Sequence, residues 1–278
     1  MKDLGVTAQT ALFCVLGDPV AHSLSPVMHN AAFAYSGFDG VYVAFRVAEI
    51  GAAIQAIRAL GIRGASVTIP HKVSAMTHID APDEQVKQIG AVNTLLNRGG
   101  VLEGRNSDSL GAVKALSATI SPAGRHAAVI GAGGAARAVA FGLTRRGARI
   151  TIVNRGRQRG ESLARDIDGD YAPLAEAGRL QADILVNTTP VGMSPDTGLT
   201  PVPEACLQSG MVVMDAIYNP AETRLLREAR KRGCRVVDGV EMFVCQGALQ
   251  FEWWTGLSAP IEVMRRAVSD ALKIGAQE

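Results

Sequence analysis

Short runs of apolar and β-branched residues alternate with longer stretches of helical composition along most of the chain. Ala11–Leu16 and His126–Ile130 have the length of buried strands, whereas Ala48–Leu60 has helical composition and ends at a glycine. Asn97–Gly100 has the sequence of a β-hairpin turn. Strands are predicted at 11–16, 41–45, 65–68, 91–96, 101–103, 126–130, 149–153, 183–186, 211–215 and 235–237. This alternation predicts an α/β fold.

The predicted elements fall into two groups along the chain. The first group runs to about residue 105, and the second begins at Arg125. From Glu241 onward the sequence is helical and carries large apolar side chains for packing, among them Phe251 and Trp254. We expect this tail to return to the first group. The predicted domains are therefore residues 1–109 with 241–278, and residues 110–240.

Composition and charge exclude several classes of protein. The chain has 278 residues, enough for about two domains, and 47% of them are hydrophobic. Because the formal net charge is only +2, neither nucleic acid nor an anionic membrane is an expected partner. No uncharged apolar run reaches the ~18 residues of a membrane span, and no secretory signal is apparent. The four cysteines and five histidines lack metal-ligand spacing, so we expect reduced thiols, no metal site and a cytoplasmic protein.

A glycine-rich turn follows the strand predicted at 126–130. Gly131, Gly133 and Ala136 fit the spacing G-x-G-x-x-A, which binds dinucleotides where it joins a strand to a helix. The first glycine permits a sharp turn, the second lets the backbone approach a pyrophosphate, and the helix N-terminus favours the anion. A purely structural glycine turn is the alternative. The candidate cofactor-binding residues of this turn are Gly131, Ala132, Gly133, Gly134 and Ala135.

The end of the next predicted strand distinguishes NADP from NAD. An NAD site places Asp or Glu about 20 residues after the glycines, where the carboxylate accepts a hydrogen bond from the ribose 2′-hydroxyl. Here the strand ends in Asn154 and Arg155, followed by Arg157 and Arg159, with no carboxylate before Glu161. Because guanidinium groups could surround a 2′-phosphate, NADP(H) is favoured over NAD. A solvated basic turn is the alternative and fits at least one of these arginines.

Polar residues of the first group form a second candidate site. Ser23 and Ser25 stand at a predicted helix entrance, where hydroxyls and first-turn N–H groups can bind a carboxylate; Ser25 alone would serve as an N-cap. Thr68 and Lys72 follow a predicted strand, and a lysine whose pKa is lowered can transfer a proton. An ordinary surface lysine is the alternative. Asn93 and Asp108 are further candidates.

Together these motifs resemble those of the shikimate dehydrogenase family, nearly from end to end. They include V-T-x-P-H-K at 67–72 and N-R at 154–155, and each alone would be weak evidence. The ordered series is specific, and it occupies 17–30, 67–72, 90–94, 104–111, 131–135, 154–155, 187–193, 215–220 and 246–248. The resemblance implies an N-terminal α/β substrate domain and a Rossmann-like NADP-binding domain, with the C-terminal helices returning to the first.

The resemblance also implies an activity: NADPH reduces the ketone of 3-dehydroshikimate to shikimate, reversibly, in the biosynthesis of chorismate and the aromatic amino acids. It implies that Ser23 and Ser25 hold the substrate carboxylate and that Lys72, paired with Asp108, transfers the proton. The remaining substrate-binding residues that it implies are Thr68, Asn93, Asp108, Tyr218 and Gln246. The residues that match the family's positions at the nicotinamide end of the cofactor are Ala216, Gly239 and the loop Asn187–Met193.

Three positions depart from the family's usual pattern. Ser66 stands where asparagine is usual, Ser107 where threonine is usual, and Gly156 where threonine or serine lies beside the adenosine phosphate. The nearest alternative is a relative that acts on quinate or an aminated ring, with NAD or NADP. The motifs do not exclude it, because the shape of the pocket discriminates between ring substituents. A non-catalytic NADP-binding sensor is a second alternative, against which the Lys72–Asp108 pair argues. A monomer and a homodimer are both compatible with the resemblance.

Overall fold

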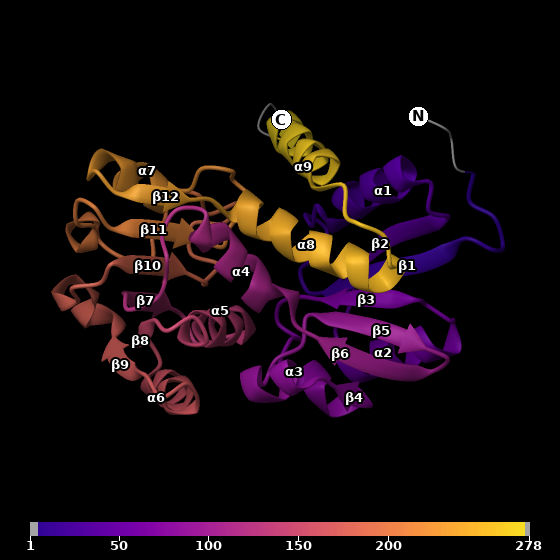
Figure 1. Ribbon diagram of the computed structural model, residues 1–278, viewed down its shortest axis with the longest axis horizontal. Coiled ribbons are helices and arrows are strands. Elements are labelled where there is room, and N and C mark those ends of the chain that lie inside the picture. Colours follow the sequence, from indigo (N-terminus) through magenta and orange to yellow (C-terminus); the bar gives the residue numbers. More distant parts are fainter. Residues whose placement is uncertain (1–4, 276–278) are drawn as a thin grey trace. The chain divides into compact units, whose positions relative to one another are not determined.

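The computed structural model describes residues 5–275. The described chain divides into two compact units, and Figure 1 shows the elements of each. Unit 1 comprises Met1–Ser107 and Gln246–Glu278, and unit 2 comprises Asp108–Cys245. The C-terminal segment therefore belongs with the N-terminal part of the chain, as the fold prediction requires. Two helices, α4 (Ser107–Ser117) and α8 (Gly239–Thr255), carry the chain from one unit into the other.

Unit 1 is built on a mixed sheet with the strand order β2-β1-β3-β5-β6-β4. Its strands are β1 (Ala11–Gly17), β2 (Gly40–Arg46), β3 (Gly64–Val67), β4 (Ala81–Pro82), β5 (Thr94–Arg98) and β6 (Val101–Arg105). β1 pairs in parallel with β2 and β3, whereas β5 pairs antiparallel with β3 and β6. Arg98 pairs with Val101, and both intervening glycines have positive φ, 62° and 94°. The predicted hairpin turn is thus confirmed.

Successive residues of β1 face two different helical layers, because side chains alternate along a strand. Cys14 and Leu16 share a core with Ile54 and Ile57 of α2 (Ile50–Ala59). Phe13 points the other way, and its ring centroid lies 5.2 Å from that of Phe33 in α1 (Ser25–Ser36). The remaining helical elements of this unit are η1 (Ser74–His78), α3 (Glu84–Ile89) and α9 (Ile261–Gly275).

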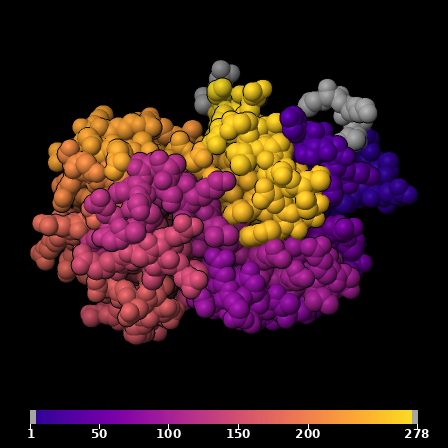
Figure 2. All heavy atoms as spheres, in the orientation of Figure 1, coloured from indigo at the N-terminus to yellow at the C-terminus, as the bar shows by residue number. Residues whose placement is uncertain are grey.

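The returning tail is held by Trp254 of α8. Its ring centroid lies 5.3 Å from that of Phe13, and its indole Nε1 donates a hydrogen bond to the carbonyl of Leu95 at 3.0 Å. A Cβ at Gly64 would lie 2.3 Å from this Nε1, so only glycine lets the ring lie against β3. In Figure 2 the spheres of the C-terminal segment (yellow) lie directly against those of the N-terminal part of unit 1.

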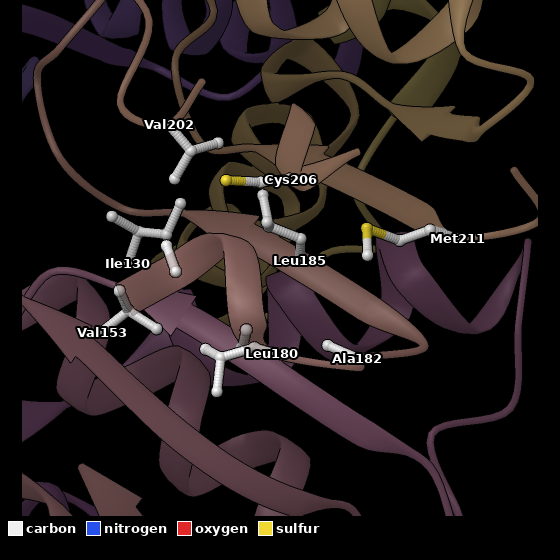
Figure 3. A pocket seen from close by; sticks show the side chains of 10 residues that line it. Ile130, Val153, Leu180, Ala182, Leu185, Val202, Cys206 and Met211 are labelled. Carbon is white, nitrogen blue, oxygen red and sulfur yellow. The ribbon is translucent and has the colours of Figure 1, made fainter. Parts of the chain in front are cut away.

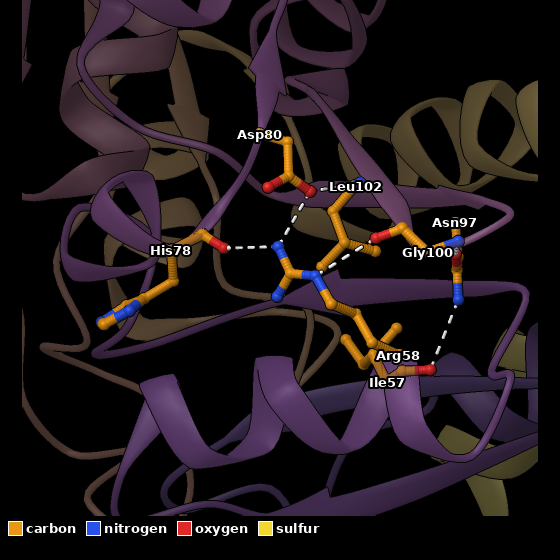
Figure 4. A network of polar contacts seen from close by, with 7 residues as sticks. All are labelled: Ile57, Arg58, His78, Asp80, Asn97, Gly100 and Leu102. Carbon is orange, nitrogen blue, oxygen red and sulfur yellow. Dashed lines mark hydrogen bonds and ion pairs between the residues drawn. The ribbon is translucent and has the colours of Figure 1, made fainter.

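Arg58 at the end of α2 ties this helix to the hairpin (Figure 4). Its guanidinium donates to the Asp80 carboxylate at 2.8 Å, to the His78 carbonyl at 3.1 Å and to the Gly100 carbonyl at 3.2 Å. The Leu102 N–H, and secondarily Arg58, lower the pKa of Asp80. These contacts satisfy backbone groups at the turn and stabilise the edge of the sheet.

Unit 2 has a fully parallel sheet with the strand order β12-β11-β10-β7-β8-β9. Its strands are β7 (His126–Ile130), β8 (Arg149–Asn154), β9 (Asp170–Pro173), β10 (Ile184–Asn187), β11 (Val212–Asp215) and β12 (Arg235–Val237). The strands progress outward in both directions from β7 and β10, which is the doubly wound Rossmann order. Ligands of such sheets bind at the carboxyl ends of the strands where the order reverses, here between β7 and β10.

Helices cover both faces of this second sheet (Figure 1). Alternate residues of β7 separate the two cores: Val129 packs with α4 and α5 (Gly134–Thr144), and Ile130 packs with α7 (Arg224–Lys231). The other helical elements are α6 (Arg157–Asp166), η2 (Leu174–Arg179) and η3 (Glu204–Cys206). Helix α5 begins at Gly134, within the predicted glycine-rich turn 131–135. The last two glycine-turn residues, Gly134 and Ala135, are therefore already helical.

Candidate active site

Ser23 and Ser25 lie together at the amino end of α1. Their hydroxyls form a 3.2 Å hydrogen bond, and Ser25 is buried. The prediction that Ser25 is the N-cap is wrong: Leu24 occupies that position, no side chain caps the helix, and Ser25 is the first helical residue. The Ser23 hydroxyl accepts a hydrogen bond from the Ser25 N–H at 3.3 Å, so it already contacts the first turn of the helix. Two hydroxyls beside a helix N-terminus suit a carboxylate ligand.

Thr68 and Lys72 occupy a loop that backbone bonds hold against the end of β1. The Thr68 N–H donates to the Leu16 carbonyl at 2.9 Å, and the Val92 N–H donates to the Lys72 carbonyl at 2.9 Å. A Cβ at Gly17 would lie 2.4 Å from Cγ2 of Thr68, so glycine there permits this close approach. The side chains of Thr68 and Lys72 are both half-buried. They lie at the carboxyl end of β3, an edge where α/β proteins place their sites.

Asn93 and Gln246 are far apart in the sequence but share one hydrogen-bonding partner, Ser107. Nδ2 of Asn93 donates to the Ser107 hydroxyl at 2.9 Å, and this hydroxyl donates to Oε1 of Gln246 at 3.1 Å. All three side chains are buried within unit 1. In the sequence Ser107 is only a departure from a motif, whereas the structure makes it the link between two candidate substrate ligands.

The glycine turn of unit 2 lies at the switch point of the sheet. Gly131 has φ of 114°, and a Cβ there would lie 2.7 Å from the Thr188 hydroxyl, which donates to the Ile130 carbonyl at 2.6 Å. Gly133 is the N-cap of α5, with no side-chain cap, and a Cβ on it would meet nothing within 4 Å. The surface at this helix N-terminus is thus open to a pyrophosphate, and the turn fits a dinucleotide.

The end of β8 presents the basic residues expected to select the cofactor. Arg155, Arg157 and Arg159 are all exposed, and the Asn154 amide donates to the Gly156 carbonyl at 2.8 Å. Arg157 donates to Glu161 at 2.7 Å, and this contact raises its pKa. The first carboxylate after the strand is thus already engaged by an arginine. This arrangement fits a 2′-phosphate better than a 2′-hydroxyl.

A buried carboxylate that sequence reasoning did not single out organises the next two loops. Asp215 at the end of β11 accepts hydrogen bonds from the Asn187 amide at 3.0 Å, the Ile217 N–H at 3.1 Å and the Thr223 hydroxyl at 2.7 Å. Burial raises its pKa to about 6, although all three hydrogen bonds oppose this shift. Asp215 therefore connects the loop 187–193 to the loop that carries Ala216.

Tyr218 and Gly239 lie beside that loop. The Tyr218 ring stacks on Phe243 of α8 with centroids 4.2 Å apart. A Cβ at Gly239 would lie 2.0 Å from the Ile217 carbonyl oxygen, so the first residue of α8 can only be glycine in this backbone arrangement. Of the predicted substrate residues, Asp108 and Tyr218 belong to unit 2, and the others belong to unit 1.

An apolar pocket under the second sheet offers no alternative site (Figure 3). Its lining includes Val153, Leu185, Val202 and Met211, and its polar groups are limited to backbone atoms and the Cys206 thiol. Burial raises the pKa of this thiol, which makes it a poor nucleophile. Within residues 5–275, no helix is long and apolar enough to cross a membrane, and no cluster of three His, Cys, Asp or Glu side chains could hold a metal ion.

Three family models match the chain in order. The shikimate dehydrogenase substrate binding domain matches residues 15–95, and the shikimate / quinate 5-dehydrogenase model matches residues 114–192. The shikimate 5'-dehydrogenase C-terminal domain matches residues 239–268.

Curated relatives and solved structures are similar over nearly the whole chain. A shikimate dehydrogenase (NADP(+)) from Symbiobacterium thermophilum is 48% identical, over 93% of this chain and 94% of the relative. A structure of shikimate 5-dehydrogenase from Thermus thermophilus with NADP(H) and shikimate is 40% identical, with a TM-score of 0.87 over 94% of this chain and 100% of that one. Quinate dehydrogenase from Corynebacterium glutamicum with NAD is 28% identical, with a TM-score of 0.86 over 94% and 99%.

Proposed function

This chain belongs to the shikimate dehydrogenase family, and we propose that it catalyses the reversible NADPH-dependent reduction of 3-dehydroshikimate to shikimate. The role that follows is a step of aromatic amino-acid biosynthesis. The observation that carries the substrate and cofactor assignment is the 48% identity with an NADP-dependent shikimate dehydrogenase over 93% of the chain. The arginines after β8 support the cofactor assignment independently.

In this proposal unit 1 supplies most of the substrate contacts and unit 2 supplies the cofactor contacts. Unit 1 binds the substrate, with Ser23 and Ser25 at the carboxylate and with Thr68, Asn93 and Gln246 at the remaining oxygens. Unit 2 binds the dinucleotide at the glycine turn, and Arg155 and Arg159 bind the 2′-phosphate. The other cofactor-side residues are Ala132, Asn154, Arg157, Ala216 and Gly239.

When bound, NADPH supplies the hydride that reduces the ketone carbon. Lys72 donates a proton to the carbonyl oxygen as negative charge develops there, so the ketone becomes a secondary alcohol. Asp108 and Tyr218 contribute further polar contacts to the substrate. In the reverse direction Lys72, as the neutral amine, accepts the hydroxyl proton of shikimate.

A quinate or aminoshikimate dehydrogenase, using NAD or NADP, is the second candidate function. It shares the fold, since the quinate dehydrogenase relative superposes with a TM-score of 0.86, but that relative is only 28% identical. A non-catalytic NADP sensor is the third candidate.

Initial-rate assays with the purified full chain test these candidates. Shikimate and quinate are each combined with NADP and with NAD, and formation of the reduced nicotinamide is followed by absorbance. We expect the highest kcat/KM with shikimate and NADP. A preference for quinate or NAD would assign the second candidate function, and no turnover with any pair would support the sensor.

A further inference from the structure

A continuous chain of hydrogen-bonded buried side chains runs through unit 1 from β2 to α8. It ends at two of the candidate substrate ligands, Asn93 and Gln246. Each member is at most 8% exposed. In order, the members are Tyr42, Ser66, Gln250, Thr94, Asn93, Ser107 and Gln246.

The first half of this chain converges on Gln250. The Tyr42 hydroxyl donates to the Ser66 hydroxyl at 2.7 Å, and Ser66 donates to Oε1 of Gln250 at 3.0 Å. The opposite end of the Gln250 amide, Nε2, donates to the Thr94 hydroxyl at 2.9 Å and to the Asn93 carbonyl at 3.3 Å. Because Oε1 accepts one hydrogen bond and Nε2 donates two, exchanging the oxygen and nitrogen of the Gln250 amide would break these bonds. The Gln250 amide can therefore adopt only one orientation.

The second half transmits this orientation to Asn93. Because the Thr94 hydroxyl accepts from Gln250, its own proton is directed to Oδ1 of Asn93, at 2.8 Å. The Ser107 N–H also donates to that oxygen at 2.8 Å. The amide nitrogen of Asn93 is thereby turned to the Ser107 hydroxyl, which donates in turn to Oε1 of Gln246.

The direction of these bonds determines what Asn93 offers to a substrate. Asn93 accepts at its carbonyl oxygen inside the chain and donates one amide N–H to Ser107, so its second amide N–H is the group that can donate to a substrate oxygen. An amide that turned over would present a carbonyl oxygen instead. A substrate hydroxyl could then bind only by donating its own proton.

We propose that Gln250 is a positioning residue for substrate binding: through Thr94 it holds Asn93 as a hydrogen-bond donor to a hydroxyl of the substrate ring. The proposal rests on the proposed function. Gln250 acts through Thr94 and Asn93, and it sits beside the sheet on the face that carries the aromatic core. Its influence should therefore appear in substrate affinity and leave cofactor affinity unchanged.

The test is steady-state kinetics of shikimate oxidation by full-length variants at one fixed pH. Gln250→Met keeps the length of the side chain and removes both its donor and its acceptor. Thr94→Val removes the hydroxyl at constant shape, and Thr94→Ser restores it. Asn97→Ala is the matched control, because Asn97 also makes internal hydrogen bonds in unit 1, to the Ile57 and Ile62 carbonyls, but belongs to the hairpin.

We expect Gln250→Met and Thr94→Val each to raise the KM for shikimate about five- to tenfold, as loss of one directing hydrogen bond implies, with the KM for NADP unchanged. Thr94→Ser should resemble the wild type. The double variant should be no worse than the more impaired single variant, since both substitutions interrupt one chain. Asn97→Ala should lower the melting temperature and leave both KM values alone.

Two results would overturn the positioning role while leaving the proposed function intact. One is an active wild type in which Gln250→Met lowers only the melting temperature, like the control. The other is a Thr94→Ser variant as impaired in KM as Thr94→Val. A wild type that does not oxidise shikimate overturns the proposed function, and this inference fails with it.

Discussion

The histidine in the aromatic core of unit 1 should make the protein sensitive to mild acid. His29 is fully buried, stacks on Tyr42 with ring centroids 4.6 Å apart, and lies 5.2 Å from the Trp254 ring. Burial lowers the pKa of His29 to about 3, and the Gln250 amide beside it opposes this shift only in part. In the unfolded chain the same imidazole has a pKa of about 6.5.

The direction of the pH effect on stability depends on whether the folded or the unfolded state is protonated at the higher pH. As the pH falls below about 6.5, the unfolded chain takes up a proton on His29 while the folded protein does not. The stabilising contribution is therefore complete above that pH and is lost progressively toward pH 3. The loss is about 1.4 kcal/mol per pH unit, which amounts to about 2 kcal/mol between pH 8 and pH 5.

Urea unfolding at pH 8 and pH 5 measures this loss. His29→Phe keeps an aromatic ring between Tyr42 and Trp254 but cannot be protonated, and His29→Leu serves if phenylalanine does not fit. The wild type should lose about 2 kcal/mol more than either variant between the two pH values. His22→Asn is the control, since His22 is exposed and its removal should leave the wild-type loss in place. Equal losses in wild type and in both His29 variants would refute the reasoning.

Three further predictions concern the candidate site. Lys72→Ala should lower kcat about 10²- to 10⁴-fold with the KM for NADP nearly unchanged, as loss of a proton donor implies; unchanged turnover would remove Lys72 from catalysis. Arg155→Ala should raise the KM for NADPH at least about tenfold and leave that for NADH alone, because only NADPH carries the 2′-phosphate; equal effects would mean that Arg155 does not contact it. Gly133→Ala and Gly239→Ala form a pair. The first should weaken NADP binding at nearly unchanged melting temperature, because its Cβ meets only open space, whereas the second should destabilise unit 2 by about 2–4 kcal/mol, because its Cβ would lie 2.0 Å from the Ile217 carbonyl oxygen. Equal melting temperatures for these two variants would contradict this reading of the two glycines.

Local patterns were enough to identify the elements whose chemistry lies within a few consecutive residues. Buried strands such as β1 and β7 have apolar runs, and the hairpin at 97–100 has its turn residues in order. The strand–glycine–helix order around Gly131 marks a dinucleotide turn for the same reason. The hydrophobic pattern did not predict helix α6, because most of its residues are polar and it buries little beyond Gly160, Leu163 and Ala164.

The amino-acid sequence thus determined the fold class, the glycine turn, the choice of NADP through the arginines after β8, and the set of motifs. It marked Ser66 as a departure from the usual asparagine without indicating which residue its hydroxyl contacts. Only the folded chain answers this, since Gln250 reaches Ser66 from a helix that comes almost at the end of the sequence. The same holds for Ser107 between Asn93 and Gln246, and for Asp215 beneath two loops. Hydrogen bonds between distant residues depend on how strands and helices pack, and short-range propensity contains no information about them.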